Sequence, residues 1–141
     1  THNVSSAASD VYKRQIEGRH ESWFTKEALD YFKQKNHCIV WNVVEGVNNP
    51  MPITSNYLYV RLIGDRSIPD NQFGKIRKNK TEIIKNWAQK LAKISDIPLA
   101  LVMANNHFEG FGPATANTLG RNLGMRELIW EEKKQKTLGN F

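Results

Sequence analysis

The chain has 141 residues, of which 40% are hydrophobic and 24% charged, and this composition suits one globular unit with a core. No stretch approaches the roughly 18 continuous apolar residues of a membrane span, and the apolar core of an export signal is not seen. A formal net charge of +6 weakly favours anionic partners such as phosphates or nucleic acid. The single cysteine, Cys38, permits no internal disulfide and is typical of a small buried side chain, so we expect a reducing, cytoplasmic location without membrane contact.

Residues 1–15, THNVSSAASDVYKRQ, differ from everything after them. They are small and polar, and they show no amphipathic period. The string SSAASDVYKRQ is similar to strings found at the ends of unrelated environmental sequence fragments. We interpret it as a sequencing or assembly junction, with a native flexible tail as the alternative. The domain is therefore placed at residues 16–141, and the chain is expected to be a fragment of a longer protein.

The first half of this domain predicts a strand, a helix and a second strand. The segment 16–20, IEGRH, is interpreted as the end of a strand. Thr25 is expected to cap a helix that has Phe32 on its apolar face. The segment 38–44, CIVWNVV, is short, β-branched and apolar, which is typical of a strand buried on both faces.

The segment 56–64, NYLYVRLIG, alternates as a strand does. Its aliphatic residues share one face and are expected to meet helices, whereas Tyr59 and Arg61 share the other face, toward the interior of a barrel. A long basic loop, 65–80, follows, and loops of this length are more often functional than idle. Thr81 is then expected to cap the next helix.

The last part of the chain predicts one more strand and helix. The helix after Thr81 carries an apolar stripe that includes Trp87, which indicates a core-facing surface. The segment 97–104 is so uniformly apolar that we expect a strand without a solvent-exposed face. Pro113 suits the first turn of a final helix. Alternating strands and helices imply a parallel sheet covered by helices.

Polar or aromatic residues follow each predicted strand. In parallel α/β folds, ligands meet the loops at the carboxyl ends of the strands. The candidate catalytic residues at this edge are Glu17, Arg19, His20, Arg61, Asn105, Asn106 and His107. The candidate substrate-binding residues are Trp41, Asn42, Tyr59, Arg66, Gly110 and Gly112. We expect them to gather on one rim, because unpaired burial of such groups costs several kcal/mol each.

Each candidate also has a structural interpretation. Glu17 and Arg19 form either a salt bridge or a substrate contact, and Asn105 and Asn106 either contact substrate or cap neighbouring loops. The turn GFGPATA, 110–116, offers backbone N–H groups to a phosphate, or its glycines serve only the bend. His20 and His107 could serve as acid–base groups or as metal ligands. No short spacing of His, Asp and Glu supports a metal site, and the cofactor stays unknown.

Three motifs, RHESW, PMPITSNYLYVRLIGDRSI and ANNHFEGFGPATAN, resemble the domain-of-unknown-function seventy-two family, also called YecE-like. The similarity runs from about Ile16 to Trp130. It implies an α/β fold of the TIM type, a (β/α)₈ barrel, of which this chain would supply about the last four strand–helix units, since a full barrel needs ~250 residues.

The family's motif positions fall on Glu17, Arg19, His20, Trp23, Arg61, Asn105 and Asn106. The chain departs from the family at Ile63, where many members have histidine, at Asn42-Val43, where many have an acidic residue, and at Gly18, where a larger residue is usual. The resemblance implies a fold and a pocket but no reaction.

The leading hypothesis is a hydrolase-like enzyme that acts on a phosphate-bearing substrate, either nucleic acid or a sugar phosphate. Glu17 or His107 would act as acid or base, and Arg19 and Arg61 would stabilise negative charge. The alternatives are a nucleic-acid-binding module without chemistry and an inert fragment. As partners we expect a phosphate-bearing small molecule or nucleic acid, together with either the missing N-terminal half-barrel or a second copy that associates through exposed sheet edges.

Overall fold

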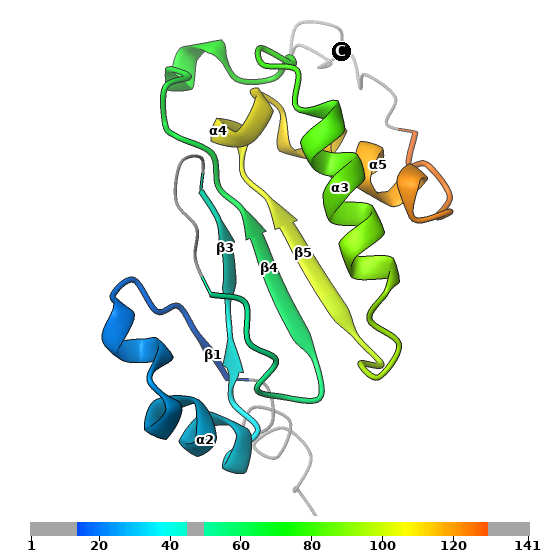
Figure 1. Ribbon diagram of the computed structural model, residues 1–141. Helices are drawn as coiled ribbons and strands as arrows, with labels where there is room; N and C mark the ends of the chain where they lie inside the picture. The colour runs from blue at the N-terminus through cyan, green and yellow to red at the C-terminus, as the bar shows by residue number, and fades with distance from the viewer. Residues whose placement is uncertain (1–13, 45–49, 130–141) are drawn as a thin grey trace, which may run out of the picture.

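The structure is a computed structural model that describes residues 14–44 and 50–129. Its strands are β1 (Gln15–Ile16), β2 (Cys38–Ile39), β3 (Trp41–Val43), β4 (Leu58–Leu62) and β5 (Ala100–Ala104). They pair in parallel, β1 with β2 and then β3, β4 and β5 in that order (Figure 1). The predicted parallel α/β architecture is therefore confirmed.

Helical segments lie between the strands and after the last of them. They are η1 (Glu21–Phe24), α2 (Lys26–Gln34), η2 (Asp70–Gln72), α3 (Thr81–Ala92), α4 (Asn106–Glu109) and α5 (Gly112–Asn122). Helix α2 lies beside β1 and β2, whereas α3 and α5 pack together on one side of β4 and β5 (Figure 1). Thr25 caps α2 as predicted, since its hydroxyl accepts a hydrogen bond from the N–H of Ala28 at 3.3 Å.

The core lies between β3–β5 and the two helices α3 and α5. The predicted aliphatic face of β4, Leu58, Val60 and Leu62, is buried in it, as is the predicted apolar stripe of α3. Trp41 of β3 and Trp87 of α3 contact each other with ring centroids 6.4 Å apart. The alternation in β4 therefore places Tyr59 and Arg61 on the opposite side of the sheet, which we call the open face.

Two local predictions are wrong. Lys80, not Thr81, occupies the N-cap position of α3, and the backbone N–H of Thr81 instead donates to the side chain of Asn79 at 3.0 Å. Strand β5 was expected to lack an exposed face, yet Leu101 and Met103 are exposed, Met103 by 53%. They lie on the open face beside Tyr59 and Arg61, and within the described residues no layer covers them.

Strand β5 is the edge of its sheet in the described part of the chain. An apolar groove of about 490 Å³ runs along this edge, between β5 and α5.

Strand β1, which pairs with β2, begins at Gln15. Gln15 is the last residue of the segment 1–15 that the sequence analysis excluded from the domain. Residues 1–13 lie outside the described residues. No helix in the described ranges has the length and apolar character needed to cross a bilayer.

Candidate functional site

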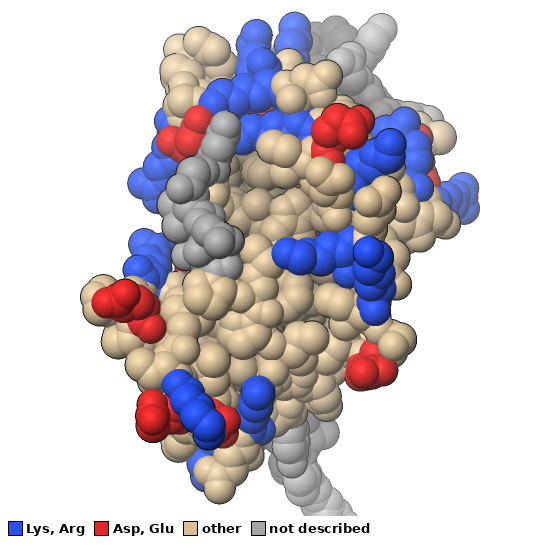
Figure 2. Space-filling model, viewed as in Figure 1, with Lys and Arg blue, Asp and Glu red and all other residues tan. Residues whose placement is uncertain are grey.

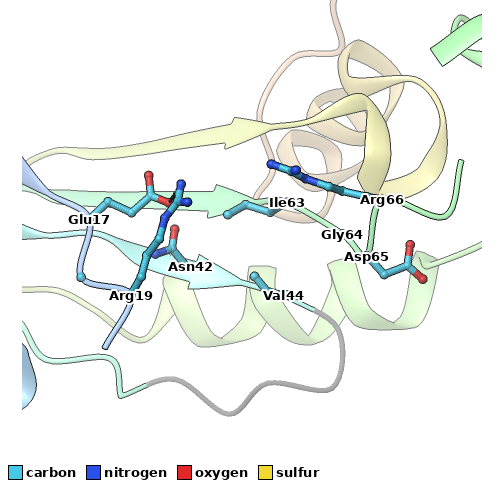
Figure 3. A pocket seen from close by; sticks show the side chains of 9 residues that line it. Glu17, Arg19, Asn42, Val44, Ile63, Gly64, Asp65 and Arg66 are labelled. Atoms are coloured by element: carbon cyan, nitrogen blue, oxygen red, sulfur yellow. Dashed lines mark hydrogen bonds and ion pairs between the residues drawn. The ribbon is translucent and has the colours of Figure 1, made fainter. Parts of the chain in front are cut away.

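A pocket of about 360 Å³ lies where the strands end (Figure 3). It is lined by Glu17, Gly18, Arg19, Asn42, Val44, Ile63, Gly64, Asp65 and Arg66. These residues follow β1, end β3 or follow β4, so the parallel order of the strands brings them together from segments far apart in the sequence. Four of the predicted site residues, Glu17, Arg19, Asn42 and Arg66, therefore share one pocket.

Glu17 links two arginines at this rim. Its Oε2 pairs with the guanidinium of Arg61, and its Oε1 pairs with Nη2 of Arg19 at 3.2 Å. The Glu17 side chain is 24% exposed, whereas that of Arg19 is 77% exposed. The salt bridge that the sequence left open is thus present. Each guanidinium has five N–H donors, so both arginines keep donors beyond those that Glu17 accepts.

A second hollow of about 330 Å³ adjoins the pocket on the open face. Glu17 lines both hollows, and Tyr59, Arg61 and Met103 line the second. Strand register explains this grouping, because Arg61 lies between Asn42 of β3 and Met103 of β5. The predicted inward face of β4 is therefore the face on which the two hollows lie.

Gly18 departs from the family pattern for a local reason. A Cβ placed on Gly18 would lie 2.8 Å from Cβ of Trp23, closer than real side chains approach. Trp23 stacks on Phe32 of α2, with ring centroids 6.1 Å apart. The absence of a side chain at position 18 therefore lets the η1 segment fold back against the end of β1.

Asp65 begins the basic loop and binds two residues of that loop. Its Oδ1 accepts hydrogen bonds from the backbone N–H and the hydroxyl of Ser67, at 3.1 and 2.8 Å. Its Oδ2 lies 2.6 Å from Nζ of Lys78. The hydrogen bond from Lys78, and then those from Ser67, hold the pKa of Asp65 well below its usual range. Asp65 is therefore an ionised, paired carboxylate.

Basic side chains gather around the same end of the molecule, near the loop that follows β4 (Figure 2). Arg66, Lys75 and Arg77 are exposed there. Lys80 is instead buried, with its ammonium 4.7 Å from the ring centroid of Phe108. The surface around the pocket is therefore basic, as the loop sequence indicated.

Seven of the predicted site residues line neither of these two hollows, and His20 and Trp41 are two of them. His20 caps η1, where its Nδ1 accepts from the N–H of Ser22 at 3.2 Å. Trp41 is only 4% exposed and lies in the core, with its indole N–H donating to the carbonyl of Pro52 at 2.9 Å. Its substrate-binding role has no support in this position, because the alternation of β3 places Trp41 on the helix side and Asn42 on the open face.

The asparagines after β5 form caps. The Asn105 side chain accepts from the N–H of His107 at 2.9 Å and begins α4, a helical turn that the sequence did not predict. Asn106 Oδ1 accepts from the N–H of Gly112 at 2.8 Å. His107 packs edge-on against Phe73 and lies 3.2 Å from the carbonyl of Ile68 through Nδ1. The structural interpretation of the asparagines is thus the one their contacts support.

The two glycines of the turn after β5 fit close backbone contacts. A Cβ at Gly110, where φ is +112°, would lie 2.3 Å from the carbonyl of Lys75. A Cβ at Gly112 would lie 2.6 Å from the carbonyl of Ala104. The N–H of Gly112 is already bonded to Asn106, so these contacts explain the glycines without a phosphate.

The sequence placed Asp65 beyond the end of its strand and Lys78 in the basic loop, but neither they nor Gly64 were predicted as catalytic or substrate-binding residues. Gly64 has φ +83°, and a Cβ there would lie 2.2 Å from the carbonyl of His107, so this glycine lets β4 end against α4. The triplet 65–67, Asp-Arg-Ser, is a signal for an Asx turn that could have been found. The ion pair between Asp65 and Lys78 joins residues 13 positions apart, so no local sequence pattern predicts it.

Within residues 14–44 and 50–129 no group of three His, Cys, Asp or Glu side chains could hold a metal ion.

Solved structures with similar folds include two DUF72 family proteins. The protein from Thermotoga maritima is 19% identical, with a TM-score of 0.62, and the match covers 80% of this chain and 46% of that one. The protein from Enterococcus faecalis is 21% identical, with a TM-score of 0.62 and coverage of 79% and 49%. The chain therefore spans about half the length of these structures.

A search of curated proteins gives no match. The sequence model of the family described as "Protein of unknown function DUF72" matches residues 4–138. That range contains every element of the structure and every residue of the pocket. The chain therefore belongs to the DUF72 family.

Proposed function

We propose that the pocket at the strand ends binds the anionic group of a phosphate-bearing substrate and that the intact protein is an enzyme acting on it. The observation that carries this proposal is the charge balance of the rim. Arg19 and Arg66 line the pocket and Arg61 lines the adjoining hollow, and these three guanidinium groups are balanced by one carboxylate, Glu17, because Asp65 is paired with Lys78. Guanidinium forks match the geometry of phosphate oxygens.

In this proposal Glu17 acts mainly as a positioning residue. Its two oxygens hold Arg19 and Arg61 side by side. The N–H donors of the two guanidinium groups are therefore already oriented toward a ligand and need no reorganisation when it binds. The two guanidinium groups would stabilise charge that develops on phosphoryl oxygens during hydrolysis. Of the two acid–base candidates only Glu17 lines the pocket, since His107 contacts Phe73 and Ile68.

The test is turnover of phenyl phosphate and nucleotide substrates by the intact protein and by Arg61→Met. We expect turnover to fall by at least ~100-fold, as for loss of one charge-stabilising donor, with a melting temperature within a few degrees of wild type. Lys26→Met removes the same charge from α2 and should leave turnover unchanged. A large drop in melting temperature at Arg61 with retained turnover would make Arg61 structural.

The nucleic-acid-binding alternative loses support from the position of its aromatic residues. Single strands bind on exposed aromatic faces interleaved with positive charge. Trp41 and Tyr57 are each only 4% exposed, and Tyr59 is half-buried on the open face. Trp23 and Tyr31 are exposed, but they belong to η1 and α2 and not to the basic loop. This alternative would regain support if oligonucleotide affinity fell steeply with salt concentration and Arg61→Met bound the oligonucleotide as well as wild type.

We also propose that the sheet is part of a (β/α)₈ barrel and that the remaining strand–helix units cover the edge of β5. The parallel order, the two hollows on the open face and the half-length match to solved DUF72 proteins support this. The apolar groove beside β5 would then receive a helix of those units. Self-association of the 141-residue chain through this edge is the other outcome, which sedimentation velocity would detect as a dimer.

A further inference from the structure

Arg66 adopts a backbone conformation that its residue type does not favour. Its φ is +60°, in the left-handed region, where a Cβ is crowded. Among the described residues other than glycine, only Asn36 shares this feature. Asn36 is an asparagine, which tolerates the region, and its amide is bonded to Asn56. Arginine has no such local compensation, so the surrounding structure must impose the conformation.

The contacts of Asp65 impose it. The Asp65 carboxylate closes the turn onto Ser67 and also binds Lys78. Lys78 is itself fixed, because its backbone N–H donates to the carbonyl of Glu109 at 3.1 Å. The buried Glu109 side chain in turn accepts from the N–H of Lys80 and the hydroxyl of Thr115. The turn that contains Arg66 is thus tied to α4 and α5 rather than left to fluctuate alone.

The turn directs Arg66 back over the pocket. Figure 3 shows the Arg66 side chain extending over Ile63 toward Glu17 and Arg19, while Asp65 points the other way. Arg66 follows β4, whereas Arg19 follows β1, so the two guanidinium groups come from opposite walls of the same pocket. A ligand between them would be held from both sides.

We infer that Arg66 determines the specificity of this pocket for phosphate monoesters, and that Asp65 and Lys78 are its positioning residues. This inference rests on the proposed anion site. Three guanidinium groups and one carboxylate leave a surplus of two positive charges at the rim. A phosphate monoester above pH 7 carries close to two negative charges and three terminal oxygens, enough to contact both walls. A phosphodiester carries one charge and two such oxygens, and it can therefore pair with the arginine of only one wall.

The decisive variant is Arg66→Gly in the full chain. Glycine adopts a positive φ without strain, so we expect an unchanged or raised melting temperature. Affinity for phenyl phosphate at pH 8, measured by calorimetry, should fall by about tenfold or more, as for loss of a charge-assisted hydrogen bond. Affinity for dimethyl phosphate should change little, so the preference for the monoester is lost. Arg66→Lys keeps the charge but not the fork, and should be intermediate.

Asn36→Gly is the matched control, because it makes the same backbone change before β2, at the opposite end of the strands. It should leave both affinities unchanged. Asp65→Asn keeps the acceptor for Ser67 but loses the ion pair with Lys78. It should weaken phenyl phosphate binding in wild type and have no further effect in Arg66→Gly, because it acts through Arg66.

The outcomes distinguish the role of Arg66 from the existence of the anion site on which it rests. If Arg66→Gly binds phenyl phosphate like wild type while Arg19→Gln binds it weakly, Arg66 has no role and the anion site stands. Arg19 is exposed enough that its substitution should not unfold the chain. A marked loss of stability in Arg66→Gly would also overturn the inference, since the residue would then be structural. If wild type binds neither phosphate ester, both proposals fail.

Discussion

The carboxylate of Glu17 is paired with the guanidinium of Arg61, 44 positions later in the chain. This pair joins the segment after β1 to β4 across β3, so it connects the two sheets of the structure. It also ties Arg61, which lines the second hollow, to Glu17, which lines both hollows. This partly buried ion pair therefore links the two hollows of the rim.

A double-mutant cycle with Glu17→Gln and Arg61→Met tests that pair. Both side chains are about a quarter to a third exposed, so solvent screening limits the coupling energy to ~0.5–1 kcal/mol. The measurement is urea unfolding of wild type, the two single variants and the double variant. The Lys26–Asp30 pair on α2, which is far more exposed, should show a smaller coupling energy. Equal coupling energies in the two cycles would mean that the Glu17–Arg61 pair stabilises the pocket no more than an exposed ion pair does.

Tyr57→Phe should stabilise the protein. The Tyr57 hydroxyl is buried and has no hydrogen-bond partner among the described residues. Removing an unsatisfied polar group should raise the free energy of unfolding by about 1 kcal/mol. Burial raises the pKa of Tyr57 to about 12, above its value in the unfolded chain, so wild type should lose stability as pH rises above about 10. Thermal melts at pH 8 and pH 11 measure both effects. A destabilised Tyr57→Phe would reveal a partner for the hydroxyl.

Gly64→Ala should destabilise the protein much more than Gly74→Ala. Both glycines have positive φ, but only at Gly64 would a Cβ collide with backbone, at 2.2 Å from the carbonyl of His107. At Gly74 nothing lies within 4 Å, so the cost there is the conformational strain of about 1–2 kcal/mol. We expect ~2 kcal/mol more at Gly64, because β4 and α4 would have to separate. Equal costs by chemical denaturation would contradict the close approach.

Acid should release the turn at Asp65. Its pKa is lowered in the folded chain, so the stabilisation is present above the unfolded value of about 4 and is lost as pH falls below it. The native-state amide signal of Ser67, which donates to Asp65, should therefore stay unchanged as pH falls through about 4 and shift only at lower pH, where Asp65 is protonated in the folded chain. Asp65→Asn should show the altered signal already at pH 7. A Ser67 shift with its midpoint near pH 4 would mean that Lys78 and Ser67 do not hold this carboxylate in its ionised form.

Periodicity in the sequence was enough to predict the parallel α/β order, because the core-facing stripes are local patterns. The β4 alternation and the α3 stripe both appear as predicted. Local patterns do not show which strand is an edge, so the exposure of Met103 was missed. They also predicted polar residues at the strand ends without distinguishing caps such as Asn105 from pocket residues such as Arg19. That distinction depends on side-chain direction, which the chain sets through contacts far apart in sequence.

The central claim is that the pocket between Arg19 and Arg66 binds an anion. Its most direct test is titration of the ¹⁵N-labelled protein with inorganic phosphate while backbone amide shifts are recorded. We expect saturable shifts at Gly18, Arg19 and residues 64–66, with α2 unaffected. Shifts confined to Gly110–Gly112, or no saturable shift at the rim, would contradict it.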